Sequence, residues 1–380
     1  AVRLHSSASA DGDLYINAST DAAVGGNLNV TATTGNITQG RAVTVGGTSS
    51  FTTSANNATI ALNTTTNAFT GAVTITTNDN SGTDADVTID GGTTALILAA
   101  STIDGDLTVR SGNASGITDS GTVTVGGNLA ATTDAANGVI NLGTLAVDGT
   151  VALTTHGSGN ATVVNDAGLN FAASTVRGNL AATATTGNMT DSGALAITGT
   201  SSFTTSANNA TIALNTTTNA FTGAVTITTN DNSGTDADVT IDGGTTALIL
   251  AASTIDGDLT VRSGNASGIT DDEATVTVGG NLAATTDANN GVINLGSLAV
   301  DGTIALQTHG SGNATVVNDA GLNFAASTVG GIFNATATTG NIVDSGALTI
   351  AGAAKFITGV DGSDIILDSS ANAFSGSVTF

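Results

Sequence analysis

Apolar and polar residues alternate in short stretches along the chain. In Ala72–Thr76 and Asp106–Val109, Val, Ile or Leu stands at every second position. A period of two places these side chains on one face of a β-strand, and the β-branched Thr and Val between and among them favour strands as well. Clusters such as Thr34–Asn36 and Asp79–Gly82 have the composition of turns. The pattern predicts an all-β chain of short strands.

A short motif recurs and reads apolar-x-Gly-x-apolar-x-apolar, with variation at the fifth place. It is seen as VGGNLNV from Val24, FTGAVTI from Phe69 and IDGDLTV from Ile103. From Val24 to Val176 the intervals between successive motifs are 21, 24, 34, 22, 22 and 29 residues. In total there are fifteen such anchors, which start at Val24, Val45, Phe69, Ile103, Val125, Val147, Val176, Ile197, Phe221, Ile255, Val278, Val300, Val329, Ile350 and Phe374.

A much longer repeat contains the short one. Thr48–Asp119 recurs letter for letter as Thr200–Asp271, an offset of 152 residues, and Gly126–Val176 returns with few changes as Gly279–Val329, an offset of 153. A third copy opens at Gly331. We therefore predict one continuous solenoid that comprises a start (1–25), a first six-coil repeat (26–177), a second six-coil repeat (178–330) and a partial third repeat (331–380).

Short strands in coils of this length predict a right-handed parallel β-helix, or β-solenoid, of about fifteen coils of 21–34 residues. The 34- and 29-residue coils are expected to carry outward loops. The Gly of each anchor is expected at a corner where a Cβ atom would clash. Asn at equivalent turns, such as Asn36 and Asn188, is expected to form amide ladders. At a rise of about 4.8 Å per coil, fifteen coils would extend on the order of 70 Å.

The composition agrees with a narrow, fully hydrogen-bonded core. The 380 residues include 10 Phe, one Met, no Trp, no Cys and no Pro, so Val, Ile, Leu and Ala must fill the interior. The formal charge of −24 disfavours nucleic acid and anionic lipid as partners. No apolar run is long enough for a transmembrane helix, so membrane insertion is not expected. The chain begins at Ala1 without a signal peptide, which suggests a piece of a longer protein.

The segments of the type GGNLNVTATTGNIT, at Gly25, Gly178 and Gly331, are followed by Ser-Gly-Ala-Leu-x-Ile or a variant of it. These strings resemble the β-helical shafts of filamentous-haemagglutinin-like bacterial adhesins, which are exported by two-partner secretion. The resemblance covers essentially the whole chain. It implies a fibrous rod at the bacterial cell surface or outside the cell, and neither a tip domain nor the family's amino-terminal export domain is recognisable.

The sharpest acidic cluster is Asp79, Asp84, Asp86 and Asp90, which is duplicated as Asp231, Asp236, Asp238 and Asp242. Oxygen-rich loops can hold calcium. The spacing matches neither an EF-hand nor the calcium-binding nonapeptide repeat. Solvated turn carboxylates are the ordinary interpretation, and calcium binding stays an open alternative.

The remaining candidate residues point to structure rather than to chemistry. His156 and His309 are repeat copies in THGSGNATVV, and His5 stands alone. Arg110 and Arg262 are also repeat copies, and a duplicated carbohydrate-active site on a β-helix would need such charged residues. Thr-x-Thr stretches (Thr31–Thr33, Thr74–Thr76) are also found on flat ice-binding faces, but variation between coils argues against that role. We expect no enzyme, no catalytic residue, no cofactor and no metal site.

Two functions remain from the sequence. The first is the structural rod of a large secreted or cell-surface adhesin or matrix protein, active in adhesion, aggregation or biofilm-type assembly. The second is a self-assembling extracellular fibre or sheath subunit whose solenoid ends stack head to tail. The expected partners are other copies of the chain, side by side or end to end, or host and cell-surface glycans or proteins.

Overall fold

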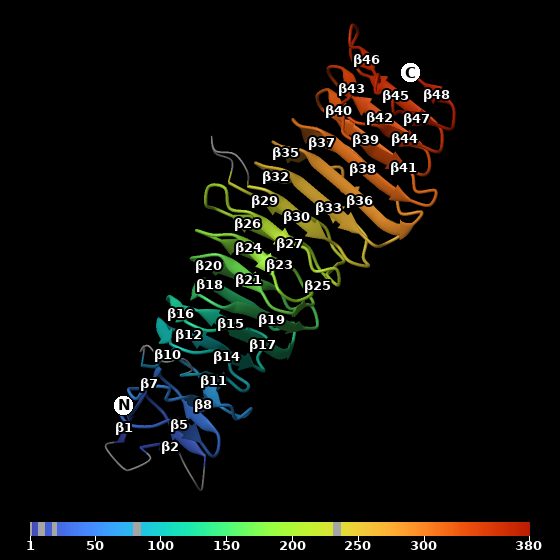
Figure 1. Ribbon diagram of the computed structural model, residues 1–380. Coiled ribbons are helices and arrows are strands. Elements are labelled where there is room, and N and C mark those ends of the chain that lie inside the picture. The colour runs from blue at the N-terminus through green and yellow to red at the C-terminus, as the bar shows by residue number, and fades with distance from the viewer. Residues whose placement is uncertain (1, 7–11, 17–20, 79–84, 231–236) are drawn as a thin grey trace. The chain divides into compact units, whose positions relative to one another are not determined.

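The structure is a computed structural model and describes residues 2–6, 12–16, 21–78, 85–230 and 237–380. It is all-β, with parallel strands that stack as a β-solenoid of about 16 turns, which confirms the predicted parallel β-helical class (Figure 1). The hand of the solenoid stays a prediction. The chain divides into two compact units, Ala1–Thr185 and Thr186–Phe380.

The strands of the first unit form three parallel columns, in which each strand pairs with its equivalents one turn before and one turn after. Column A contains β1 (Val2–Ser6), β4 (Leu28–Ala32), β7 (Ser49–Thr53), β10 (Val73–Thr76), β12 (Leu96–Leu98), β13 (Ser101–Ile103), β15 (Ile117–Asp119), β16 (Val123–Val125), β18 (Ile140–Val147), β20 (Ala161–Asn165) and β23 (Leu180–Ala184). Column B contains β2 (Leu14–Ile16), β5 (Ile37–Gln39), β8 (Ile60–Leu62), β11 (Val87–Asp90), β14 (Leu107–Ser111), β17 (Leu129–Ala136), β19 (Thr150–His156), β21 (Leu169–Phe171) and β22 (Ser174–Val176). Column C is short, with β3 (Ala22–Val24), β6 (Val43–Val45) and β9 (Ala68–Phe69).

The second unit repeats columns A and B. Column A contains β26 (Ser201–Thr205), β29 (Val225–Thr228), β31 (Leu248–Leu250), β32 (Ser253–Ile255), β34 (Ile269–Asp271), β35 (Val276–Val278), β37 (Ile293–Val300), β39 (Ala314–Asn318), β42 (Phe333–Ala337), β45 (Ala354–Thr358) and β48 (Val378–Thr379). Column B contains β24 (Met189–Asp191), β25 (Leu195–Ile197), β27 (Ile212–Leu214), β28 (Ala220–Phe221), β30 (Val239–Asp242), β33 (Leu259–Ser263), β36 (Leu282–Asn289), β38 (Ile304–His309), β40 (Leu322–Phe324), β41 (Ser327–Val329), β43 (Ile342–Asp344), β44 (Leu348–Ile350), β46 (Ile365–Ile366) and β47 (Ala373–Phe374).

One long repeat is seven turns, and the prediction of six coils is wrong. Column A passes from Ser201 to Ala354, an offset of 153 residues, through seven successive pairings: β26–β29, β29–β31, β31–β34, β34–β37, β37–β39, β39–β42 and β42–β45. The anchor motif undercounts the turns because some strands are not preceded by it. Strand β20 is one of these: Gly159 fills the glycine place of the motif, but Gly157 stands at its first place instead of an apolar residue.

The 29-residue interval does not carry the loop that its length predicts. Between Val147 and Val176 the chain forms β19, β20, β21 and β22, one strand more than the ordinary 22-residue interval between Ile103 and Val125. The 34-residue interval likewise contains the additional strand β11, next to residues 79–84, which lie outside the described part. In the 29-residue interval the extra length therefore forms one further side of the solenoid, whereas the loop expected of the 34-residue interval stays a prediction.

The core is the narrow space that the inward side chains of successive turns share. Strands such as β7 and β14 alternate buried residues with half-buried or exposed ones, as the period of two requires. Aromatic rings from different turns meet edge to face, with Phe51 and Phe69 6.0 Å apart at their centroids and Phe203 and Phe221 5.8 Å apart. All four rings are fully buried.

The predicted corner glycines are confirmed by their contacts. A Cβ atom on Gly71 would lie 2.5 Å from the carbonyl oxygen of Gly47 on the preceding turn, and one on Gly149 would lie 2.4 Å from that of Gly127. The requirement is close approach between turns, because neither Gly71 nor Gly149 has a positive φ.

Candidate functional site

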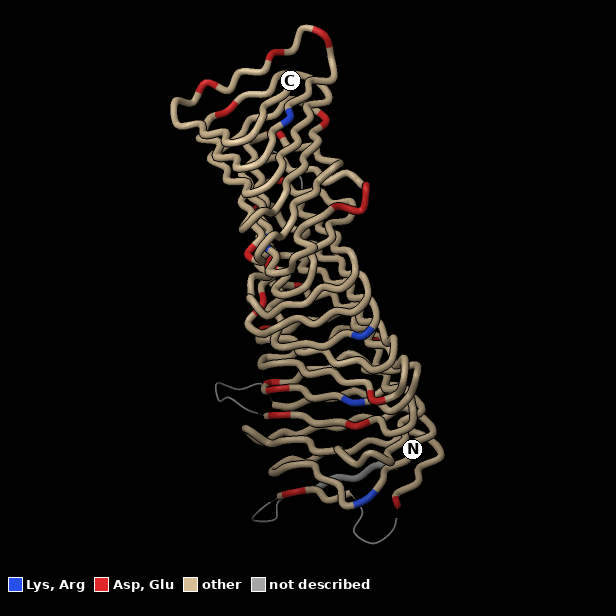
Figure 2. Tube along the Cα trace, turned by 90° about the vertical axis from the view of Figure 1, so that its right-hand side faces the viewer, with Lys and Arg blue, Asp and Glu red and all other residues tan. Residues whose placement is uncertain are grey.

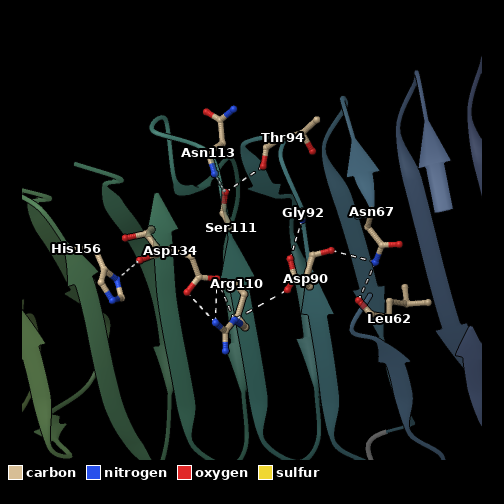
Figure 3. Close-up of polar contacts among 11 residues, drawn as sticks. Leu62, Asn67, Asp90, Gly92, Thr94, Arg110, Ser111, Asn113, Asp134 and His156 are labelled. Carbon is tan, nitrogen blue, oxygen red and sulfur yellow. Dashed lines mark hydrogen bonds and ion pairs between the residues drawn. The ribbon is translucent and has the colours of Figure 1, made fainter. Parts of the chain in front are cut away.

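A charged row crosses three neighbouring strands of column B. Asp90 ends β11 and lies opposite Arg110 of β14 in register, and Asp134 follows on β17 (Figure 3). The Arg110 Nη2 atom donates to both Asp134 carboxylate oxygens at 2.7 and 2.9 Å, and its Nε atom donates to Oδ2 at 3.3 Å. The Arg110 Nε atom is 4.0 Å from the Asp90 Oδ2 atom. The guanidinium thus ties one turn to the next through a bidentate ion pair.

Asp90 is the buried member of this row. Its side chain is 5% exposed, against 47% for Arg110 and 40% for Asp134. Burial raises the pKa of the Asp90 carboxyl, and the backbone N–H of Gly92, which donates to Oδ1 at 2.7 Å, opposes that rise together with Arg110. The hydrogen bond to Asp134 raises the pKa of Arg110. Arg110 therefore remains a cation, and its guanidinium group is already paired with Asp134.

The second long repeat contains the same row. Arg262 donates to the two Asp287 oxygens at 2.8 and 2.9 Å, and Asp242 accepts the Gly244 N–H at 2.8 Å. Asp242 lies opposite Arg262 in register, as Asp90 lies opposite Arg110. The duplicated basic residues of the sequence are thus two copies of one link between turns.

The acidic cluster that suggested calcium separates into different roles. The Asp86 Oδ1 atom accepts the backbone N–H of Asp106 at 2.8 Å, whereas Asp90 belongs to the charged row. Asp238 and Asp242 repeat this division. Asp79, Asp84, Asp231 and Asp236 lie outside the described residues. Within the part of the chain that the structure describes, no three His, Cys, Asp or Glu residues form a group able to hold a metal. Calcium binding by the whole loop stays a hypothesis.

Asp86 begins a ladder that the sequence analysis did not find. The Asp106 Oδ1 atom accepts the Asn128 N–H at 2.7 Å, and the Asn128 Oδ1 atom in turn accepts the Thr150 N–H at 2.9 Å and hydroxyl at 2.8 Å. The members precede or begin β11, β14, β17 and β19, so each carboxyl or amide oxygen caps the next turn. The second repeat builds the same ladder from Asp238, Asp258, Asn281 and Thr303.

The predicted asparagine ladders are present in a different form. The Asn36 Oδ1 atom accepts the Thr59 N–H at 2.7 Å, and the Asn188 Oδ1 atom accepts the Thr211 N–H at 2.9 Å. The stacked partner is therefore a backbone amide rather than a second asparagine side chain. The backbone N–H groups of Thr59 and Thr211 thus find a hydrogen-bond acceptor on the neighbouring turn.

Buried asparagine side chains also form hydrogen bonds with backbone groups of neighbouring turns. Asn67 is fully buried; its Oδ1 atom accepts the Val43 N–H at 2.8 Å and its Nδ2 atom donates to the carbonyls of Leu62 and Asp90 (Figure 3). Asn165 similarly accepts the Val147 N–H and donates to the Val147 carbonyl. Their bonds to the backbone of neighbouring turns join residues 18 to 24 apart, and Asn67 also exchanges hydrogen bonds with the amide of Gln39.

The two described histidines also bond to the adjacent turn. His156 Nδ1 is 2.7 Å from the Thr133 carbonyl oxygen, and His309 Nδ1 is 2.7 Å from that of Thr286. Since a carbonyl only accepts, Nδ1 carries the proton in both residues. The side chain of His5 lies outside the described part. None of the described residues forms a helix of the length and apolarity that crossing a bilayer requires.

The stacked turns and the ladders between them define a β-solenoid repeat protein. The sequence profile of one repeat family matches residues 6–76, 158–228 and 311–380, at offsets of 152 and 153 residues that agree with the long repeat. The chain belongs to this family, which is described as repeats of unknown function (DUF5649). Comparison with curated proteins and with solved structures found no match.

Proposed function

We propose that the chain is a shaft segment of a large bacterial protein that is secreted or displayed on the cell surface, where it serves adhesion, aggregation or matrix assembly. One observation carries the proposal. Charged and amide side chains that were candidates for chemistry form hydrogen bonds and ion pairs between neighbouring turns. The ladder from Asp86 to Thr150 and the charged row at Arg110 are examples. Side chains that link one turn to the next stiffen a long stack of turns.

The repetition supports the same role. Thr48–Asp119 and Thr200–Asp271 are identical, including residues on the outer surface where a single binding site would need distinct residues. A shaft requires equivalent turns and tolerates copies. The acidic charge of −24 agrees with an exported, soluble surface. The resemblance to filamentous-haemagglutinin-like shafts is a further, compositional support for the bacterial surface as its location.

Deletion of residues 48–199 tests the proposal. The deletion joins Gly47 to Thr200, and the residues that follow are the same as those that follow Gly47 in the intact chain. Electron microscopy of the intact chain should show particles of one length, shortened in the variant by about 34 Å for seven turns at a rise of about 4.8 Å. Indefinite filaments would instead favour the head-to-tail fibre subunit. Turnover of a polysaccharide by the purified chain would contradict a purely structural role.

A further inference from the structure

Threonine side chains form a row on the outer face of column A in the first unit. Five threonines on successive turns lie opposite one another in register, namely Thr31 on β4, Thr52 on β7, Thr76 on β10, Thr102 on β13 and Thr124 on β16. All five are half-buried or exposed, in strands whose alternate residues are buried. The row therefore presents one hydroxyl and one methyl group per turn.

A second row of small polar or apolar residues runs beside the first, two residues earlier on each turn. It consists of Asn29, Ser50, Thr74, Ala100 and Thr122, which are all half-buried or exposed. Asn29, Ser50 and Thr74 are opposite one another in register, and Ala100 and Thr122 directly precede β13 and β16. We call the ten residues of the two rows the threonine face.

The alignment of these residues is not visible in the sequence. Successive members of the first row are 21, 24, 26 and 22 residues apart, and Thr-x-Thr occurs within the face only at Thr74–Thr76 and Thr122–Thr124. That variation between coils argued against an ice-binding face. In the structure the register compensates for the unequal turn lengths, and the first row keeps threonine on all five turns.

The second unit carries a copy of the face. Thr204, Thr228, Thr254 and Thr277 are in register on β26, β29, β32 and β35. The residues two places earlier are Ser202, Thr226, Ala252 and Thr275, and all eight are half-buried or exposed. Each unit therefore presents the same regular surface.

The threonine face is uncharged, although the chain has a net charge of −24. Figure 2 shows charged segments scattered among long uncharged stretches of the trace. The carboxylates nearest to the face in sequence are at strand ends, where Asp104 follows β13 and Asp119 ends β15. Among the described residues, the seven threonine hydroxyls of the face have no hydrogen-bond partner, whereas the buried Thr53 hydroxyl donates to the Ala58 carbonyl at 3.1 Å. The outward hydroxyls are therefore available to water.

From this we infer that the threonine face binds ice. Turns stack about 4.8 Å apart and residues two apart on a strand are separated by about 6.6 Å, which gives a two-dimensional grid of side chains. Oxygen atoms in a prism plane of ice repeat at comparable distances. The stiff χ1 of threonine orders the hydroxyls before binding, so that little rotamer freedom is lost on contact with the lattice. The inference goes beyond the proposed structural role, because it gives one face of the shaft a ligand.

A lattice explains why one residue type recurs over five turns. Each turn meets the same arrangement of water molecules, so each turn needs the same side chain. A single soluble molecule would require different residues at different places, as binding pockets have. A charged partner would require charges, which the face lacks.

Thermal hysteresis of the full chain tests the inference, measured as the gap between the melting and freezing temperatures of a single ice crystal. The intact chain should produce hysteresis and faceted crystals. T76Y, T102Y, T228Y and T254Y together place rings in both copies of the face and should abolish the hysteresis. Tyr is favoured in strands, so circular dichroism should be unchanged. T102Y with T254Y, one ring per copy, is the milder second variant and should reduce the hysteresis.

The matched control makes the same substitution on column B. T88Y, T108Y, T240Y and T260Y replace half-buried threonines that are in register in pairs on β11, β14, β30 and β33. This variant should keep the hysteresis of the intact chain, because its rings lie on another side of the solenoid.

An intact chain without hysteresis overturns the inference, as do column A variants that are as active as the column B control. Retention on crystalline cellulose without an effect on ice also overturns it and would assign the face to a polysaccharide surface. None of these results bears on the shaft itself, because the particle length in the deletion of residues 48–199 reports on that separately.

Discussion

Asp90 and Arg110 lie directly opposite each other on adjacent strands, yet the short ion pair of Arg110 is made with Asp134. The Arg110 Nε atom is 4.0 Å from the Asp90 Oδ2 atom, whereas its Nη2 atom is 2.7 Å from the Asp134 Oδ1 atom. Asp90 is thus a buried carboxylate with a cation near it and a backbone N–H bound to it. Its ionisation should be visible in the stability of the first unit.

The stability contributed by Asp90 should fall as the pH rises. Burial raises the pKa of Asp90 in the folded chain above the unfolded value of about 3.9, so between these two values the folded state binds more protons than the unfolded state. Its contribution is fully present below the unfolded pKa and is lost as the pH rises through the folded pKa. As the pH rises from about 3 to about 7, D90N should therefore gain stability relative to the intact chain.

Unfolding midpoints in denaturant across this pH range measure the effect. Asn at position 90 can still accept the Gly92 N–H, so the comparison isolates the charge. A midpoint difference between D90N and the intact chain that is the same at every pH would contradict the prediction.

N128A should loosen one rung of the polar ladder. The Asn128 Oδ1 atom accepts from both the N–H and the hydroxyl of Thr150, and loss of such a hydrogen-bonded pair costs about 1 kcal/mol. Hydrogen exchange at the Thr150 amide should accelerate in the variant. N281A is the matched copy, and it should accelerate exchange at Thr303 and leave Thr150 unchanged. Equal protection of Thr150 in N128A and the intact chain would exclude a stabilising role for the ladder.

G149A should be strongly destabilising and G143A should not. A Cβ atom at position 149 would lie 2.4 Å from the Gly127 carbonyl oxygen, which is backbone and cannot move aside without shifting a turn, whereas none of the described atoms lies within 4 Å of a Cβ at position 143. We expect a loss of about 2 kcal/mol or more for G149A and less than about 0.5 kcal/mol for G143A. Thermal unfolding compares them directly, and similar midpoints would show that the turns are not closely packed there.

F203A should open a cavity in the core of the second unit. Phe203 is fully buried against Phe221 at a centroid distance of 5.8 Å, and truncation of such a ring costs about 3 to 5 kcal/mol. F203L, which keeps most of the volume, should cost less than half as much. Denaturant unfolding with a probe in the second unit measures both, and a loss for F203A no larger than that for F203L would contradict a closely packed core.

Much of the fold can be predicted from the residue pattern, because the pattern follows from strand geometry and from close contact between turns. The alternation in Val73–Thr76 predicts β10, and the corner position of Gly71 follows from its place in the anchor. The number of turns could not be obtained in this way, because Gly157 stands before β20 where the anchor has an apolar residue, and the strand sequence ATVVN reads as part of a longer connection. The corner before β20 is nevertheless as close as the others, because a Cβ atom on Gly159 would lie 2.2 Å from the Gly138 carbonyl oxygen.

The polar ladders were harder to predict than the strands. Asp86, Asp106 and Asn128 are 20 and 22 residues apart, and nothing in their immediate neighbourhoods distinguishes them from solvated turn residues. Their contact depends on register, which is determined by the summed lengths of two strands and the turns between them. The charged row was missed for the same reason: Arg110 and Asp134 are 24 residues apart.

The identity of Thr48–Asp119 with Thr200–Asp271 has a consequence for heredity. If the coding DNA of the two segments is as similar as their products, recombination between them removes or adds 152 residues at a single step. In the joined chain the turns on either side of the junction have the same residues as neighbouring turns in the original chain. The junction is therefore packed as before. Descendants of one cell could then differ in the reach of this protein while every turn in it stays the same.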